Sequence, residues 1–366
     1  MITIEFVVPG SLDTRTGGYR YDKRVTDDLA SAGHTVNIHT LSSKYPFPGT
    51  AEQDKAERVL SSIQDGSVTV IDGLAFGVLP AVLARHAERL QLIALVHHPL
   101  ALETGLNEAE ALSLRNSERA ALVHARRVIT TSPSTTTSLA DYGVAAHRIT
   151  TIEPGTDSAP QARGSESERL NLLCVATLTA RKGHGVLIKA LSKVQQAAPE
   201  IAWHLHCVGS TERDAPALTQ VRDLVVSTGL SEHISLHGEA DDAALAEHYA
   251  RADVFVLASY HEGYGMVLTE ALARGLPIIS TTAGAIPDTV PADCGILVEA
   301  GDVDALADAL ASVLGDSRLR SQLRDSALGA RTQLRSWTDA AEEFAEACTL
   351  DTPSACVSTE AGSYHG

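Results

Sequence analysis

Short apolar runs alternate with amphipathic segments along nearly the whole chain, and this alternation limits the folds that the chain can adopt. Such a pattern predicts βαβ units, in which parallel strands are packed between helices. The first set of predicted strands is Ile2–Val8, Thr35–Leu41, Val68–Asp72, Leu92–Val96, Val128–Thr131 and Arg148–Ile152. The second set is Leu170–Ala176, Ala202–Val208, Ile234–His237, Val254–Leu257, Ile278–Ser280 and Gly295–Val298.

A segment rich in proline, glycine, serine and charge, Glu153–Glu168, lies between the two sets and indicates a linker. A chain of 366 residues also suits two domains better than one. We therefore predict an α/β protein with two Rossmann-like parallel-sheet domains, and a single large sheet is the less favoured alternative. The predicted division is at residues 1–157 and 158–335. Residues 351–366 are expected to be a disordered tail.

Charge and composition argue against several classes of partner. The net charge of −17 disfavours nucleic acid and strong attachment to an anionic membrane. No run of 18 apolar residues is present, and the N-terminus MITIEFVVPG lacks the basic region of a signal peptide, so we expect a cytoplasmic protein. The five cysteines have no C-x-x-C spacing and the fifteen histidines form no H-E-x-x-H motif, so no disulfide framework or metal site is predicted.

The segment SYHEGYGMVLTEALARGLPII, residues 259–279, follows an apolar strand and opens a helix near Met266. A helix start offers unpaired backbone N–H groups, which suit phosphate and hydroxyl oxygens. Glu262 and Glu270 can both face this site and accept hydrogen bonds from a polyhydroxylated ligand. The alternative is that both are solvated glutamates favoured by the helix dipole. The flanking Gly263 and Gly265 favour a ligand site, because they let backbone approach closely.

This segment resembles the E-x7-E signature of glycosyltransferase family 4. The matching positions are Ser259, Glu262, Gly263, Tyr264, Gly265, Glu270, Ala271, Ala273, Gly275 and Pro277. The resemblance implies the GT-B architecture, in which two Rossmann-like domains face each other across a cleft that binds a nucleotide sugar. It implies that Glu262 binds the donor sugar and Glu270 the ribose, and that Gly263, Tyr264, Gly265, Met266 and Val267 line the donor site.

A second match is VATLTARKGHG, residues 175–185, which runs from a strand into a helix. Similar family loops place an arginine and a lysine on the donor diphosphate, and Lys182 matches that lysine. The usual arginine position is occupied by Thr177, so Arg181 is the candidate to supply the missing charge. The alternative for both cations is an ordinary surface position at a helix start.

Two further matches lie in the first half. Gly17–Gly18, just before a predicted helix, resembles the family's first glycine-rich loop and is assigned to donor binding, although a simple tight turn is the alternative. Tyr19, Arg20 and Tyr21 beside it are acceptor-side candidates. In LVHHPLALE, residues 95–103, His97 matches a histidine near the transferred sugar and His98 is assigned to the acceptor side. A core or capping histidine is the alternative for His97.

The last two matches concern the connections between the domains. EPGTD, residues 153–157, resembles the family's interdomain segment, and Ser336–Trp337–Thr338 resembles the start of its last helix. A helix at 336–350 is therefore expected to cross back to the first domain.

The expected function is retaining transfer of a hexose-type sugar from a nucleoside-diphosphate sugar to a hydroxyl of a small-molecule or glycan acceptor. His97, Lys182 and Glu262 are the expected catalytic residues, and the resemblance implies a front-face mechanism without a cofactor or metal. The alternative is a catalytically weakened nucleotide-sugar-binding protein. Thr177 supports this alternative, because it stands where the family usually has an arginine. An NAD-dependent dehydrogenase is remote, because the sequence has no G-x-G-x-x-G fingerprint at its first strand.

Overall fold

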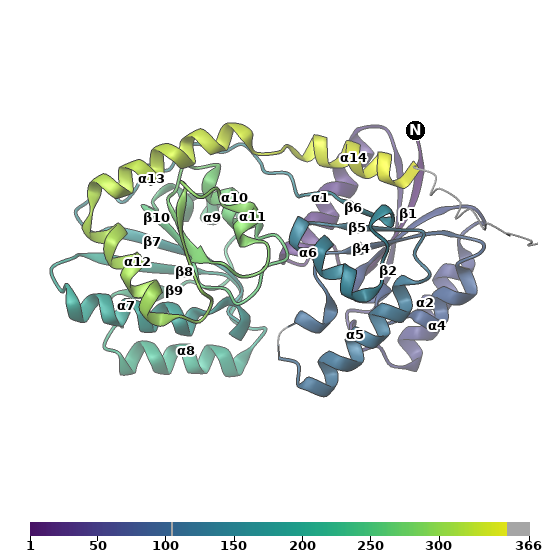
Figure 1. The fold of residues 1–366 in the computed structure, drawn as a ribbon, viewed down its shortest axis with the longest axis horizontal. Coiled ribbons are helices and arrows are strands. Elements are labelled where there is room, and N and C mark those ends of the chain that lie inside the picture. Colours follow the sequence, from purple (N-terminus) through teal and green to yellow (C-terminus); the bar gives the residue numbers. More distant parts are fainter. Residues whose placement is uncertain (104, 350–366) are drawn as a thin grey trace, which may run out of the picture.

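The computed structural model describes residues 1–103 and 105–349, which form two domains, each built on a parallel sheet of six strands (Figure 1). The first sheet has the order β2-β1-β3-β4-β5-β6 and comprises β1 (Thr3–Pro9), β2 (Thr35–Leu41), β3 (Val68–Asp72), β4 (Gln91–Val96), β5 (Arg127–Thr130) and β6 (Ile149–Thr151). The second has the order β12-β11-β10-β7-β8-β9 and comprises β7 (Leu170–Val175), β8 (Trp203–Val208), β9 (Ile234–Leu236), β10 (Val254–Leu257), β11 (Ile278–Thr281) and β12 (Gly295–Val298). All predicted strands are therefore confirmed, with ends that shift by at most one residue.

Helices cover both sheets, as the alternation predicts. In the first domain they are α1 (Gly17–Ser31), α2 (Thr50–Ser62), α3 (Gly73–Phe76), α4 (Pro80–His86), α5 (Glu108–Leu122) and α6 (Pro133–Ser138). In the second they are α7 (His184–Ala197), α8 (Ala215–Ser227), α9 (Asp242–Ala250), α10 (Met266–Leu272), α11 (Ile286–Thr289), α12 (Val303–Gly315) and α13 (Ser317–Ala330), followed by α14 (Trp337–Thr349). No helix among the described residues has the length and apolarity needed to cross a bilayer.

The chain order of the strands reverses at one point in each sheet, and these points locate the ligand side of the fold. In the first sheet β1 pairs with β3, and in the second β7 pairs with β10. Loops leave the carboxyl ends of such neighbouring strands in opposite directions, which opens a crevice where ligands bind. A ligand site is therefore expected among the residues that follow β1, β4, β7 and β10.

The helix α14 packs on the first domain, although it follows the whole of the second (Figure 1). Trp337 and Phe344 are buried in the same apolar cluster as Phe6 of β1 and Val25 of α1. The two connections between the domains run side by side, because Thr156 donates to the carbonyl of Arg335 at 2.8 Å. The predicted tail, residues 351–366, lies outside the described residues, as does the last residue of the predicted final helix.

Candidate active site

Lys182 is placed by a tight turn between β7 and α7. The turn ends at Gly183, whose φ is +68° and whose missing side chain leaves room for the end of β10. A Cβ at Gly183 would lie 1.9 Å from the carbonyl oxygen of Ala258. The glycine thus brings the Lys182 turn against the loop that follows β10, where Glu262 lies.

Lys182 and Glu262 form a close ion pair at this point. The lysine Nζ lies 2.6 and 2.8 Å from the two carboxylate oxygens, and the Glu262 side chain is only 7% exposed. Burial raises the pKa of Glu262, but Lys182 and Arg181 outweigh burial and hold the pKa below its ordinary value. Glu262 is therefore an ionised hydrogen-bond acceptor at neutral pH.

Arg181 completes a small group of two cations around one carboxylate. Its guanidinium lies 3.8 Å from Glu262 and donates a 2.6 Å hydrogen bond to the carbonyl of His261. The side chain thus points toward the predicted donor residues, and this direction was unknown from the sequence. The arrangement offers positive charge beside a carboxylate, as a sugar diphosphate requires.

Glu270 lies one turn inside α10, as predicted, and its carboxylate is shared between the domains. Tyr249 of α9 donates to it at 3.0 Å, and Arg20 of α1 donates to it at 2.6 Å. Arg20, an acceptor-side candidate, thus contacts the predicted ribose carboxylate. Tyr249 was missed by the sequence reasoning.

The start of α10 has the geometry expected from its glycines. Gly265 precedes the helix with φ +91°, and Leu268 is the first residue whose N–H bonds back to it. The N–H groups of Met266 and Val267 thus have no intrahelical acceptor. The backbone carbonyl of Tyr264 accepts a 2.7 Å hydrogen bond from the Thr289 hydroxyl, which fixes the loop before the helix.

The first domain meets this loop directly. A Cβ on Gly263 would lie 2.3 Å from the carbonyl oxygen of His97, and a Cβ on Gly18 would lie 3.2 Å from the His97 ring. Gly17 faces the end of the Met266 side chain. Gly17 and Gly18 form the first turn of α1 and do not precede it, so their N–H groups lie among the unpaired donors of a helix start.

His97 is held by two buried carboxylates that the sequence reasoning did not single out. Its Nε2 lies 3.0 Å from Asp22 and 3.5 Å from Asp72, both of which are almost fully buried. Burial lowers the pKa of His97, but attraction to the two carboxylates outweighs burial and raises the pKa to about 10. Burial raises the pKa of Asp22 to about 7, since His97 offsets burial only in part. His97 is therefore a cation at neutral pH.

The ligand atoms of these three residues also lie within 4.8 Å of one another, close enough to hold a metal ion. A protonated ring between two carboxylates accounts for the same geometry. Asp72 could have been identified as a site residue from the sequence, because it lies at the carboxyl end of β3, beside the reversal point of the sheet.

The remaining acceptor-side candidates lie in different surroundings. Tyr19 donates to the carbonyl of Pro9, and burial raises its pKa to about 12. His98 lies 3.2 Å from Glu103. Tyr21 is 1% exposed and donates to the carbonyl of Ile152 at 3.1 Å. The structure therefore places Tyr21 beneath the site, in edge contact with the His97 ring, where it cannot touch an acceptor directly.

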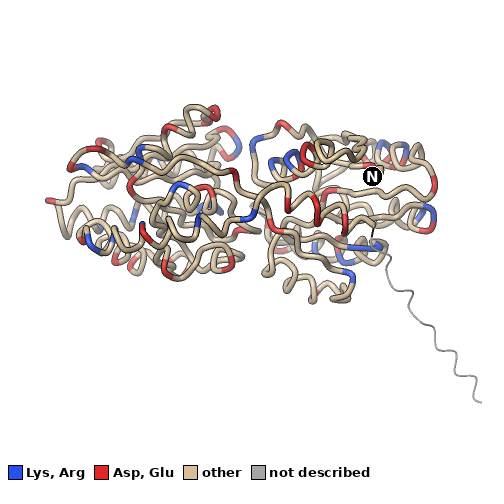
Figure 2. Tube along the Cα trace, turned by 90° about the horizontal axis from the view of Figure 1, so that it is seen from above, with Lys and Arg blue, Asp and Glu red and all other residues tan. Residues whose placement is uncertain are grey.

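The two halves of the site are held together by polar contacts across the junction. Ser134 of α6 donates from its N–H and its hydroxyl to Asp288 of α11, at 3.1 and 2.6 Å. Arg15 bonds the carbonyl of Ala240 and pairs with Glu239. Lys and Arg are otherwise interspersed with Asp and Glu over both domains (Figure 2).

Comparison with known families places both halves of the chain in one group. The family described as "Glycosyltransferase Family 4" matches residues 55–159, and "Glycosyl transferases group 1" matches residues 169–316. The two matches lie in tandem, one on each sheet domain.

Individual relatives agree with this assignment. A GDP-mannose-dependent alpha-(1-6)-phosphatidylinositol monomannoside mannosyltransferase of Mycobacterium tuberculosis is 31% identical over 51% of this chain and 48% of the relative. The aligned part thus spans about half the length of this relative. An MMP alpha-(1->4)-mannosyltransferase of Mycolicibacterium hassiacum is 25% identical over 84% of this chain and 76% of the relative.

The fold is similar to that of a solved sucrose-phosphate synthase from Thermosynechococcus elongatus. The TM-score is 0.80 at 21% identity, over 94% of this chain and 98% of that structure. At this identity the likeness concerns the fold, and it confirms the GT-B architecture.

Proposed function

Because the chain belongs to glycosyltransferase family 4, we propose that it transfers a hexose from a nucleoside-diphosphate sugar to an acceptor hydroxyl. The observation that carries the proposal is the ion pair between half-buried Lys182 and buried Glu262 at the reversal point of the second sheet. This pair puts a fixed cation and a fixed ionised carboxylate side by side. A sugar diphosphate presents the complementary groups, phosphate oxygens and sugar hydroxyls.

In this proposal the second domain binds the donor. Lys182 and Arg181 stabilise the diphosphate, whose negative charge grows as it leaves. Glu262 accepts hydrogen bonds from the sugar, and Glu270 accepts them from the ribose. The N–H groups of Met266 and Val267 are positioned to add donors at the same loop.

The first domain supplies the opposite wall of the site. The N–H groups of Gly17 and Gly18 face the diphosphate, and the cationic His97 ring lies next to the transferred sugar. Nδ1 of His97 has no hydrogen-bond partner among residues 1–103 and 105–349, so it is available to a ligand. Asp22 and Asp72 are positioning residues, because they act through His97.

The bond changes follow a front-face substitution. The bond from the anomeric carbon to the leaving phosphate oxygen breaks, and the acceptor oxygen forms a bond to the same face. The acceptor's proton passes to the departing phosphate oxygen, and no residue becomes covalently attached. Retention of configuration follows, and neither a metal nor a cofactor is needed in this scheme.

GDP-mannose is the first donor to test, since two of the relatives described above are mannosyltransferases and one is named as GDP-mannose-dependent. The acceptor we propose is a small soluble molecule or glycan, for which the acidic composition gives the support. We also propose a cytoplasmic location, which suits the free thiols of Cys174, Cys207, Cys294 and Cys348.

The domain limits belong to the same proposal. We assign residues 1–157 to the acceptor side, 158–335 to the donor side and 336–350 to the returning helix. The paired crossings near Thr156 and Arg335 support this division.

The deciding experiment has two stages. A thermal-shift screen against GDP-, UDP-, ADP- and dTDP-sugars identifies the donor, because a ligand that binds only the folded state raises the melting temperature. Release of the nucleoside diphosphate from that donor is then measured for the native protein and for Glu262→Gln and Lys182→Gln. Each substitution is expected to lower turnover by about 100- to 1000-fold, the usual effect of losing one electrostatic contact in a transition state.

Glu232→Gln and Lys189→Gln are matched controls, since both side chains are exposed on the second domain. Near-native turnover in either site variant would contradict the assigned role. Donor binding without release or transfer would support the alternative, a nucleotide-sugar-binding protein that lacks the usual arginine at Thr177.

A further inference from the structure

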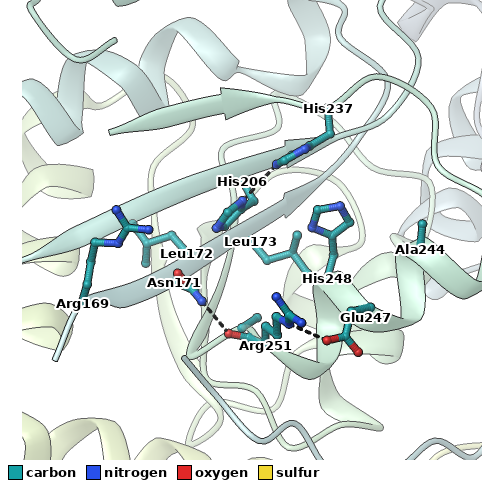
Figure 3. A pocket seen from close by; sticks show the side chains of 11 residues that line it. Arg169, Asn171, Leu172, Leu173, His206, His237, Ala244, Glu247, His248 and Arg251 are labelled. Carbon is teal, nitrogen blue, oxygen red and sulfur yellow. Dashed lines mark hydrogen bonds and ion pairs between the residues drawn. The ribbon is translucent and has the colours of Figure 1, made fainter. Parts of the chain in front are cut away.

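The second domain contains a cavity of about 430 Å³ that is lined by three histidines (Figure 3). His206, His237 and His248 project toward one another in it, and Arg169, Glu247 and Arg251 supply the charged part of its lining. None of these six side chains belongs to the donor site described above. The cavity is therefore a separate feature of the second domain.

Three different elements bring the histidines together. His206 lies on β8, His237 directly follows β9, and His248 lies on α9. Residue 206 is in register with Ser235 of the neighbouring parallel strand, so His237 is two residues further along on the same face of the sheet. Tertiary folding alone assembles the cluster, which is why no sequence motif indicates it.

The nitrogen atoms are spaced as metal ligands are. His206 Nδ1 lies 2.9 Å from His237 Nε2, and one ring nitrogen from each of the three residues lies within 4.8 Å of the others. Zinc–nitrogen bonds of roughly 2.0–2.1 Å in a tetrahedral site separate ligand nitrogens by about 3.3 Å. Small side-chain rotations would therefore bring all three nitrogens onto one ion, which would replace the shared proton of the His206–His237 contact.

The chemical surroundings suit neutral imidazole, the form that binds a metal. Burial and the neighbouring histidines lower the pKa of His206 to about 4, and burial lowers the pKa of His237 and of His248. Arg251 is already ion-paired with Glu247, which leaves Arg169 as a further positive group in the lining. That charge favours water or a small anion as a fourth ligand.

We propose that His206, His237 and His248 bind one divalent transition-metal ion of the zinc type, with a fourth position open to water or a small anion. Three imidazoles and an open position form a known class of zinc site, and imidazole also suits nickel, copper and cobalt.

The ion would join elements that position the interdomain junction. The connection from His237 to α9 contains Glu239 and Ala240, both of which contact Arg15 of the first domain. The residue after His248, Tyr249, holds Glu270. A bound ion would thus fix both the loop and the helix from which these contacts arise, and it leaves the metal-free chemistry of the transfer step unchanged.

The test uses the full chain with any affinity tag removed and bound metal stripped by a chelator. Titration with Zn²⁺ is followed by calorimetry, and titration with Co²⁺ by its visible spectrum, which reports the coordination geometry. One ion per chain is expected, together with a rise in melting temperature. His206→Ala, His237→Ala and His248→Ala should each weaken binding by more than about 100-fold, since even outer partners of metal ligands are worth 10- to 100-fold.

Two control variants distinguish binding at this cluster from binding at histidines elsewhere in the chain. His147→Ala removes an exposed histidine in the first domain, and His204→Gln removes the neighbouring histidine on β8 whose Nε2 contacts Ser235. Both should bind as the native chain does. His237 is exposed, so its alanine variant is expected to fold even where that of His206 does not. Native-like affinity in a folded His237→Ala would overturn the proposal. If Asp72→Asn then lost binding, the ion would lie at the group of Asp22, Asp72 and His97 in the first domain.

Discussion

His97 shows how strongly a single residue depends on groups that are distant in sequence. Its ring would be mostly neutral at pH 7 in an unfolded chain, where the pKa is about 6.5. In the native protein the Asp22 and Asp72 carboxylates raise the pKa to about 10. The positive charge at the junction is therefore a product of the fold, and in the proposed function it lies next to the transferred sugar.

Replacing Asp22 by asparagine should reduce this charge. Burial then acts on His97 with one carboxylate fewer, so the pKa of the ring should fall. In the native protein the His97 ring should stay protonated from pH 6 to 9, whereas in Asp22→Asn it should lose its proton within or below this range. NMR of protein with labelled histidine measures both, and Asp27→Asn on the exposed side of α1 is the control.

The same shift has a consequence for stability. A group whose pKa is higher in the folded state stabilises that state below its unfolded pKa and loses this contribution as pH rises through its folded pKa. The free energy of unfolding, measured with urea, should therefore fall between pH 6.5 and about 10, and the fall should be smaller in Asp22→Asn. Equal falls in the two proteins would contradict the assigned pairing.

From the sequence, a site residue can be singled out where its side chain lies in a local motif. Glu262 and Lys182 lie in loops next to glycines, and the structure brings them together. Asp22 and Asp72 have no such motif, because their partner is 75 or 25 residues away. Tyr21 was expected on the acceptor side, although Tyr21, Val25 and Leu29 have the four-residue spacing of a buried helix face, and all three are buried.

At the scale of elements, the turn between β7 and α7 depends on Gly183. Gly183→Ala should destabilise the second domain by more than the roughly 1–3 kcal/mol of left-handed strain alone, because the new Cβ would overlap the carbonyl oxygen of Ala258. Lys182 would also be displaced, so donor binding should weaken. Urea unfolding and donor titration measure the two effects.

Gly229→Ala is the matched control for this substitution. Its φ is +73°, close to the +68° of Gly183, but a Cβ there would meet no atom within 4 Å. It should therefore show the strain alone and bind donor normally. Equal losses in the two variants would mean that close packing against Ala258 is unimportant.

Strands were predicted closely because every residue of strands such as β10 is buried, which yields an unbroken apolar run. The helix α9 was not singled out, and its sequence DAALAEHYA explains why. Only Tyr249 of this helix is fully buried, so it has no apolar stripe to recognise. The helix contributes His248 to the histidine cluster and the Tyr249 hydroxyl to Glu270, and both contributions depend on where the helix packs in the second domain.

At the scale of the whole molecule, the proposed activity requires that the two domains close. The Ser134–Asp288 contact is one place where closure can be opposed without touching the donor residues. Ser134→Asp would put two carboxylates together and should favour an open form. Small-angle scattering should show a larger radius of gyration, and turnover should fall while donor affinity changes little.

Thr137→Asp adds the same charge on the exposed side of α6 and serves as the control. It should leave both the radius and the turnover at native values. A compact, fully active Ser134→Asp would show that this contact does not hold the closed arrangement.

The position of α14 has a consequence for how the protein is made. The core around Phe6 and Val25 includes Trp337 and Phe344, so the first domain is completed by the last segment of the described chain. A ribosome releases N-terminal segments first, and domains usually fold in that order. Here the second domain has all its strands before the first has all its core. The second domain can therefore be finished early, while the first domain waits until α14 has been made.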